Sequence, residues 1–198
     1  MKSRVLNTLA ALAVMLPLSS HAENFGYSFI DFAVVPEIEA DSPGGGRDID
    51  GDGFQLRGSL AVHQNFFALV EIEDIGFDDV DVDFTRWLIG GGGHWPINQN
   101  LDFVARGGLV RYDVDYGRFG DDDDLGFFLG GRVRARVAQS VELEGGVEMT
   151  TAEVGGFEDE ITFVGEGRYH FNNQWSAGGF VNVGDDLSQI GIYGRFNF

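Results

Sequence analysis

Apolar and polar residues alternate along much of this chain, and the pattern is clearest between Leu125 and Met149. Alternate positions there are apolar on both sides of the segment 138–140: Leu125, Phe127, Leu129, Val133, Ala135, Val137, Val141, Leu143, Val147 and Met149. The positions between them carry mainly glycine and arginine before the turn and glutamate after it. A period of two residues is typical of a β-strand with two unlike faces. The stretch therefore predicts an antiparallel β-hairpin.

The charges of this hairpin fix a register. A three-residue turn places Arg136 opposite Glu142 and Arg134 opposite Glu144, so that opposite charges meet across the strands. In a soluble sandwich the apolar face would form the core. In an outer-membrane barrel the apolar face would meet lipid, and the charged face would line a narrow interior.

Ten strand-like segments can be marked along the chain, each long enough for a tilted strand to cross a bilayer. They are residues 25–35, 53–62, 66–76, 82–94, 101–113, 125–137, 141–152, 160–171, 175–184 and 187–198. The pattern predicts an all-β fold, an antiparallel up-and-down transmembrane β-barrel of ten strands. Eight strands are the alternative if two of the weaker hairpins do not span.

Two kinds of connection alternate between these segments. One kind is short and rich in Asn and Gln: 63–65, 96–100, 138–140 and 172–174. The other kind is acidic and often longer: 36–52, 77–81, 114–124, 153–159 and 184–186. Alternation of short and long connections is typical of periplasmic turns and extracellular loops, and an even strand number puts both termini on the periplasmic side.

The first 22 residues have the features of a secretory signal peptide. Lys2 and Arg4 precede an apolar run, and Ser20-His21-Ala22 is an A-x-A-like cleavage site. The run is short for a retained anchor helix, which is the alternative. We expect residues 23–198 to form the barrel domain. No segment of that domain approaches the length of an apolar transmembrane helix, and the chain has no cysteine, which fits a sheet closed by backbone hydrogen bonds.

Charge is distributed unevenly. Without Lys2 and Arg4 the chain has 11 arginines against 32 acids, a net charge of −21, which disfavours nucleic acid as a partner. Turning the polar faces inward gives a neutral interior, a ladder of eight arginines and eight acids: Arg57, Arg86, Arg106, Arg132, Arg134, Arg136, Arg168 and Arg195, with Asp31, Glu71, Glu73, Asp102, Glu142, Glu144, Glu148 and Glu166. The excess acids fall in or beside the acidic connections, at one end of the molecule.

Aromatic residues fall near both ends of the predicted strands. Seven lie near the short turns: Phe66, Trp95, Phe103, Tyr169, Phe171, Trp175 and Phe198. Five lie near the acidic connections: Phe54, Phe84, Tyr112, Phe127 and Phe163. Two such girdles are expected at the two membrane interfaces. In a soluble sandwich, the same residues would be core aromatics.

The signal peptide, the amphipathic segments and the terminal stretch from Gly191 to Phe198 resemble small outer-membrane β-barrel proteins of Gram-negative bacteria. In particular, the chain is similar in size to OmpX-like and OmpA-transmembrane-domain-like proteins. Its recurring motif, a short Asn/Gln turn followed by an aromatic or aliphatic strand start, looks like that of a family of small barrels in plant-associated bacteria. The resemblance implies a structural, membrane-integrity or surface-interaction role, with lipid and lipopolysaccharide around a monomer. It also implies that Tyr193, Phe196 and Phe198 form the signal read by the barrel-assembly machinery, although the usual glycine of that signal falls at Tyr193.

The positions of the histidines bear on whether the barrel is an enzyme. The mature chain has His63, His94 and His170, each beside a short turn, whereas outer-membrane lipid A deacylases and omptin-type proteases hold a histidine near the opposite rim. No Ser-His-Asp arrangement is expected there. We therefore predict no catalytic residues and no bound cofactor, and a lipid-modifying hydrolase is the alternative from the enzyme class.

One acidic loop matches part of a cation motif. Asp48, Asp50 and Asp52 have the D-x-D-x-D-G spacing of the first half of an EF-hand, but the twelfth position is Ser59 instead of a bidentate Glu. A weak Ca²⁺ site on these three aspartates is one interpretation, and an ordinary solvated loop is the other.

The interior arginines and glutamates also have two interpretations. They line a charge-selective pore, or they neutralise one another and fill a narrow barrel. We favour the filled interior, in which Arg134→Ala destabilises the barrel unless Glu144 is also removed. The predicted function is a non-catalytic outer-membrane barrel with a structural or surface-interaction role. A narrow porin-like channel is the first alternative, and a soluble secreted β-sandwich is a further one.

Overall fold

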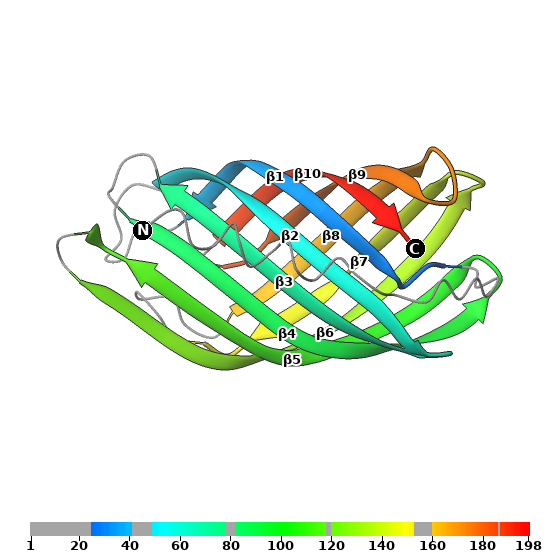
Figure 1. Cartoon of the computed structure of the whole chain (residues 1–198), viewed down its shortest axis with the longest axis horizontal. Coiled ribbons are helices and arrows are strands. Elements are labelled where there is room, and N and C mark those ends of the chain that lie inside the picture. The colour runs from blue at the N-terminus through cyan, green and yellow to red at the C-terminus, as the bar shows by residue number, and fades with distance from the viewer. Residues whose placement is uncertain (1–24, 41–48, 78–81, 118–119, 153–159, 186) are drawn as a thin grey trace.

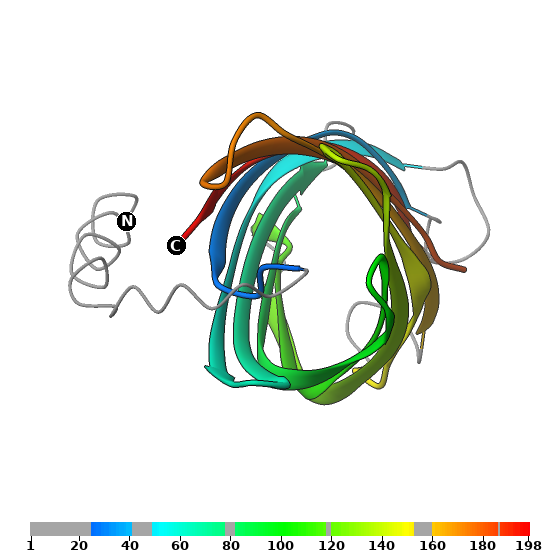
Figure 2. The same cartoon turned by 90° about the vertical axis from the view of Figure 1, so that its right-hand side faces the viewer.

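The computed structural model describes residues 25–40, 49–77, 82–117, 120–152, 160–185 and 187–198. Ten antiparallel strands form within these ranges: β1 (Phe29–Ala40), β2 (Ile49–His63), β3 (Phe66–Phe77), β4 (Asp83–Asn98), β5 (Leu101–Asp115), β6 (Asp121–Ala138), β7 (Val141–Thr150), β8 (Glu160–His170), β9 (Trp175–Val183) and β10 (Leu187–Asn197). Each strand pairs with its neighbour in sequence, and β1 pairs with β10, so that the sheet closes into a barrel (Figures 1 and 2). The predicted fold is confirmed with ten strands, and the eight-strand alternative is wrong.

The connections alternate as predicted. At one end β2–β3, β4–β5, β6–β7 and β8–β9 are joined by residues 64–65, 99–100, 139–140 and 171–174, and this end is called the short-turn end below. The other five connections meet at the opposite, long-loop end, and residues 41–48, 78–81, 118–119, 153–159 and 186 in them lie outside the described residues. No helix in the described part of the chain is long and apolar enough to cross a membrane.

Several strand boundaries differ from those predicted. β1 begins at Phe29 instead of residue 25, and it continues to Ala40 through residues that the sequence pattern assigned to a loop. The strand accommodates Pro36, which has no N–H to donate, because the register shifts there on both sides of β1. β6 begins at Asp121 because the backbone of residues 121–124 pairs with that of residues 112–115 and leaves three of these four aspartates exposed.

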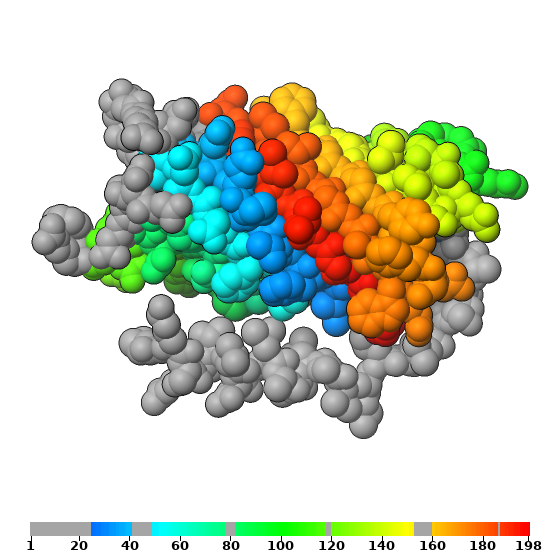
Figure 3. Space-filling view, turned by 90° about the horizontal axis from the view of Figure 1, so that it is seen from above, coloured from blue at the N-terminus to red at the C-terminus, as the bar shows by residue number. Residues whose placement is uncertain are grey.

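The outer wall of the barrel is apolar. Every strand presents a large exposed apolar side chain there, for example Phe32, Phe54, Val70, Ile89, Phe103, Phe127, Leu143, Phe163, Val181 and Ile192. Figure 3 shows β1, β2, β9 and β10 side by side as one wall. An exposed apolar surface of this extent is unfavourable in water. It is the surface that lipid requires.

The aromatic residues predicted for the two girdles lie on the outer wall, with two exceptions, both on the long-loop side. Phe84 and Tyr112 do not lie on the outer wall but pack into the barrel interior, with Phe84 in an apolar cluster around Ile75 and Val114. Their positions in β4 and β5 have the parity of the inward face, and the ring centroids are 5.2 Å apart. Proximity to a loop in the sequence does not determine which face an aromatic residue occupies.

Candidate functional site

The interior of the barrel holds the sixteen charged residues that the sequence pattern assigned to it. Together these residues form the charge network: Arg57, Arg86, Arg106, Arg132, Arg134, Arg136, Arg168, Arg195, Asp31, Glu71, Glu73, Asp102, Glu142, Glu144, Glu148 and Glu166. All eight arginines make ion pairs with acids of the network. Charges removed from water are costly unless they are paired and hydrogen-bonded, so the network is a condition for a stable interior.

Glu142 on β7 is the most heavily shared carboxylate. Its oxygens lie 2.8 Å from Arg134 Nη2, 2.8 Å from Arg136 Nη2 and 3.0 Å from Arg168 Nη1. His170 Nε2 lies 3.2 Å away on the same carboxylate. One buried anion therefore faces three guanidinium groups close to the short-turn end.

The backbone register of this hairpin is as predicted, but one ion pair is not. Arg134 is opposite Glu144 and Arg136 is opposite Glu142. The Arg134 side chain nevertheless bonds to Glu142, and Glu144 pairs with Arg132 at 3.2 Å. Long arginine side chains reach diagonally across a sheet. The expectation that removing Glu144 compensates Arg134→Ala named the wrong carboxylate.

A second part of the network joins the first and last strands. Arg195 on β10 donates two hydrogen bonds to Asp31 on β1, at 2.5 and 2.6 Å. Arg57 bridges Asp31 and Glu166, at 2.9 Å to each. Tyr193 donates its hydroxyl hydrogen to Glu166 and accepts a hydrogen bond from Arg168 at 2.9 Å.

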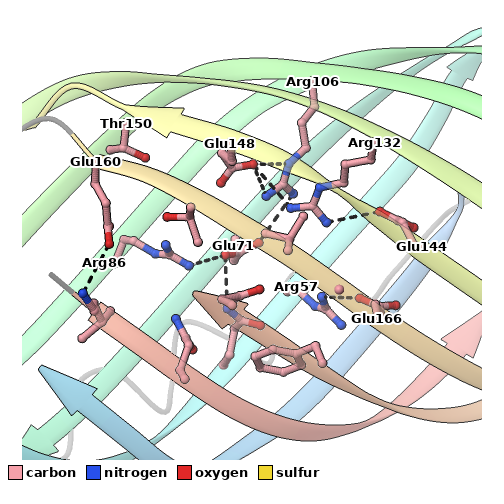
Figure 4. A pocket seen from close by; sticks show the side chains of 18 residues that line it. Arg57, Glu71, Arg86, Arg106, Arg132, Glu144, Glu148, Thr150, Glu160 and Glu166 are labelled. Atoms are coloured by element: carbon pink, nitrogen blue, oxygen red, sulfur yellow. Dashed lines mark hydrogen bonds and ion pairs between the residues drawn. The ribbon is translucent and has the colours of Figure 1, made fainter. Parts of the chain in front are cut away.

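A third part lies toward the long-loop end (Figure 4). Arg86 pairs with Glu71 at 2.6 Å and with Glu73 at 3.0 Å, and Arg106 pairs with Glu148 at 2.5 Å. Gln55, which the sequence reasoning did not single out, donates from Nε2 to Glu71 at 3.1 Å. Its inward parity on β2 was the available signal.

Glycine makes room for rings and arginines on the inner wall. A Cβ on Gly92 would meet Phe67 Cζ at 2.4 Å, and one on Gly191 would meet the Phe180 ring at 2.3 Å. A Cβ on Gly146 would meet the Gly131 carbonyl oxygen at 2.2 Å and Arg132 Cγ at 2.9 Å, so this glycine allows a close approach of the neighbouring backbone as well as of the arginine. Rings that cover a glycine on the adjacent strand fill the interior without overpacking it.

The space left in the interior is small. One cavity of about 40 Å³ lies on the long-loop side, and another of about 70 Å³ lies toward the short-turn end. Six residues of the network line both cavities, and they are called the dividing layer: Arg57, Glu71, Arg106, Arg132, Glu144 and Glu166. A water molecule needs roughly 10–15 Å³ of such volume, so each cavity holds only a few waters.

The histidines lie where the sequence placed them, near the short turns. His94 is buried with Nδ1 3.3 Å from Asp102 Oδ2, and its ring stacks on Tyr27 at 3.9 Å. His63 is exposed beside Phe66. Among the described residues no hydrogen bond joins a serine to the His94 imidazole, and the His94–Asp102 pair is packed against the Tyr27 ring.

The candidate Ca²⁺ site is only partly described. Asp50 and Asp52 are exposed on β2, and Asp48 lies outside the described residues. No group of three acidic, histidine or cysteine side chains in the described ranges has a metal-binding arrangement. Ca²⁺ binding by these three aspartates stays a prediction.

The residues of the assembly signal occupy two different faces. Tyr193 points into the barrel and is buried, whereas Phe196 packs outside against Trp175 at 4.9 Å and Phe198 at 6.4 Å. The backbone N–H of Phe198 donates to Ser28 at 3.1 Å, beside the seam between β10 and β1. Recognition of these residues by the assembly machinery stays a prediction.

No protein-family model matches the chain, and no curated protein matches its sequence. In structure it is similar to the β-domain of the Bordetella autotransporter BrkA, with 8% identity over 88% of this chain and 100% of that one and a TM-score of 0.53. It is also similar to an outer-membrane channel from Pseudomonas putida F1, with 10% identity, coverage of 93% and 100%, and a TM-score of 0.51. The neisserial surface protein NspA covers 90% of this chain and 100% of its own length, with 16% identity and a TM-score of 0.44.

At these identities the comparisons concern the fold. A closed antiparallel barrel with an apolar outer wall and a network of paired charges in its interior is the architecture of proteins that span the outer membrane with strands. The resemblance drawn from the sequence is confirmed at this level, and a closer relation to the small barrels of plant-associated bacteria stays a prediction. The chain has the fold and the outer surface of a small outer-membrane β-barrel.

Proposed function

We propose that this protein is a non-catalytic outer-membrane barrel that acts as a structural or surface-interaction element, with an interior closed by its own charge network. The observation that carries the proposal is the dividing layer, six charged residues that line both interior cavities, each with room for only a few waters. A passage for solutes needs a continuous space, and the paired side chains fill it. The expected partners are outer-membrane lipid, lipopolysaccharide and the barrel-assembly machinery.

The proposal that the barrel is non-catalytic rests on the histidines. His94 is enclosed beneath Tyr27, and His170 contributes to the group of cations around Glu142. Neither histidine lines one of the two interior cavities, where a substrate would have to lie. The solved structures compared above are a transporter domain, a channel and a surface protein, which supports this proposal indirectly.

A narrow passive channel is the second candidate, and two cavities in series favour it. Planar-bilayer recording of the refolded protein separates the candidates. We expect no steady conductance from the native chain, and a steady ion-selective conductance would overturn the closed interior.

A bilayer that shows no conductance because the barrel is closed must be distinguished from one into which no protein has inserted. The matched control is the pair Arg132→Ser with Glu144→Ser, which removes one cation and one anion from the dividing layer and so keeps the net charge unchanged. Glu148, the other partner of Arg132, keeps Arg106. This variant should conduct under the same conditions. Heat-modifiable migration of both proteins on a denaturing gel, after membrane fractionation, tests whether each is a folded barrel in the outer membrane.

A further inference from the structure

Residues 25–27 lie inside the short-turn mouth of the barrel. They precede β1, and the blue stretch before that strand turns into the ring in the end view (Figure 2). The side chains of Phe25 and Tyr27 are only 1% and 4% exposed. Two aromatic residues ahead of a strand, at the end of a barrel that opens to water, are buried by the barrel itself. This segment is called the plug.

The plug is held first by arginines of the charge network. Arg134 donates from Nη1 to the Gly26 carbonyl oxygen at 3.1 Å, and its guanidinium carbon lies 5.0 Å from the Phe25 ring centroid. The Arg136 guanidinium carbon lies 5.0 Å from the same ring. Cations over aromatic faces attract the ring electrons, and such contacts strengthen when water is excluded.

Tyr27 supplies the second set of contacts. Its hydroxyl donates to Asp102 at 3.0 Å, and its ring stacks on His94 at 3.9 Å and on Phe67 at 5.3 Å. Its carbonyl oxygen accepts a hydrogen bond from Ser59 at 2.7 Å. These contacts are specific, but they are few.

None of the plug residues belongs to a strand ladder. The pairing of β1 with β2 and with β10 begins at Phe29, and Ser28 is tied on both sides, to Ala61 and to Phe198. The plug can therefore leave the mouth by a change at Ser28 without the loss of any ladder hydrogen bond. Segments held by side-chain contacts alone open at a lower free energy than strands in a sheet.

More arginines than acids line the cavity beneath the plug. Tyr27 and Phe29 line it, together with five arginines and three glutamates: Arg57, Arg106, Arg132, Arg134, Arg195, Glu71, Glu144 and Glu166. The cavity on the long-loop side has the opposite bias, with four arginines and five glutamates. The acids that pair with Arg134 and Arg195, Glu142 and Asp31, lie outside this lining, so the surplus belongs to the lining and not to the net charge. Within the lining, Arg57 Nε and Arg132 Nε have no hydrogen-bond partner in the described part of the chain. Buried donors without a partner, in a water-poor site, favour an anion as acceptor.

We propose that residues 25–27 are a displaceable plug, and that the cavity they cover is a chamber for small anions, such as phosphate or a short carboxylate, which enter from the short-turn end. The dividing layer forms the far wall of the chamber. This inference concerns access from one end only, so it does not depend on whether the barrel conducts.

Cysteine labelling tests it, because the native chain has no cysteine. Leu69 lines the chamber and is buried, and Leu69→Cys places a single thiol there. The folded protein is treated with a negatively charged sulfonatoethyl or a positively charged trimethylammonioethyl methanethiosulfonate reagent. The test variant adds Phe25→Ala and Tyr27→Ala. The control instead adds Phe66→Ala and Phe103→Ala, two exposed rings near the same end.

We expect slow labelling in the parent and in the control. In the plug variant the anionic reagent should react faster by about tenfold or more, which corresponds to about 1.4 kcal/mol of closing free energy. The cationic reagent should gain less, and millimolar phosphate should slow the anionic one. Equal labelling of plugged and unplugged barrels that both show heat-modifiable migration would overturn the plug. A larger gain for the cationic reagent, or no effect of phosphate, would overturn the anion chamber.

Discussion

The two halves of the barrel interior balance their charges in different ways. Near the short turns, the single carboxylate of Glu142 faces three arginines and a histidine. Toward the long loops, Arg86 is shared between two carboxylates, those of Glu71 and Glu73. One group has several cations around a single anion and the other has two anions around a single cation, although the whole network contains eight of each sign. Charge neutrality is therefore a property of the entire interior and not of each pair.

The largest expected effect comes from Glu142→Ala, which breaks the short-turn side of this comparison. The change removes the carboxylate partner of the buried Arg134, whereas Arg168 keeps Glu166. A buried charge without its partner costs roughly 3–5 kcal/mol. Urea unfolding of the protein in lipid vesicles measures the loss. Glu144→Ala is the matched control, because Arg132 keeps Glu148 at 3.4 Å. Equal losses in the two variants would show that charges balance pair by pair.

The next largest loss in the free energy of unfolding, about 1–3 kcal/mol, should be similar in both halves of the interior. Gly92→Val and Gly191→Val each push a side chain into a ring, that of Phe67 on the short-turn side and that of Phe180 on the long-loop side. The same unfolding measurement compares them. Phe67→Ala in the Gly92→Val background should recover part of the loss, whereas Phe67→Ala alone should destabilise. A lack of coupling between the two sites would contradict the contact.

Glu73→Gln tests the long-loop half of the interior, and the free energy of unfolding should fall by roughly 1 kcal/mol. Arg86 keeps Glu71 at 2.6 Å, and the new amide oxygen still accepts a hydrogen bond from Gln55. A loss as large as that of Glu142→Ala would show that the acids of this half are not in surplus. The unfolding midpoints of both variants, measured side by side, decide this point.

The smallest effect is expected outside the network. Arg111 pairs with Asp113 and Asp123, but its side chain is 52% exposed, so water and salt screen the pairs. Arg111→Ala should leave the unfolding midpoint unchanged within error at physiological salt. A clear loss would mean that the acidic residues around Arg111 stabilise the barrel rather than only solvating its rim.

The sequence predicted the parts of this structure that depend on side-chain parity. The strand number, the register at Arg136 and Glu142, and the outward face of Leu129 all follow from a period of two residues. Parity says nothing about which partner a long side chain selects, and Arg134 therefore bonds diagonally to Glu142.

The plug could not be predicted for a related reason. Phe25 and Tyr27 alternate with polar or small residues as a strand would, so the pattern extended the first strand to include them. Their burial depends on a mouth that exists only when ten strands have closed. Contacts between segments more than 100 residues apart, such as Gly26 with Arg134, leave no local periodicity to detect.

The ion pair between Asp31 and Arg195 joins residues 164 positions apart, across the seam where β1 meets β10. These two charges meet only when the last pair of strands zips together. A sheet that reached the hydrocarbon region with its seam still open would present both of them, unneutralised, beside its unpaired strand edges. Closing the seam therefore removes two costs at once, that of the unpaired strand edges and that of the two unpaired charges.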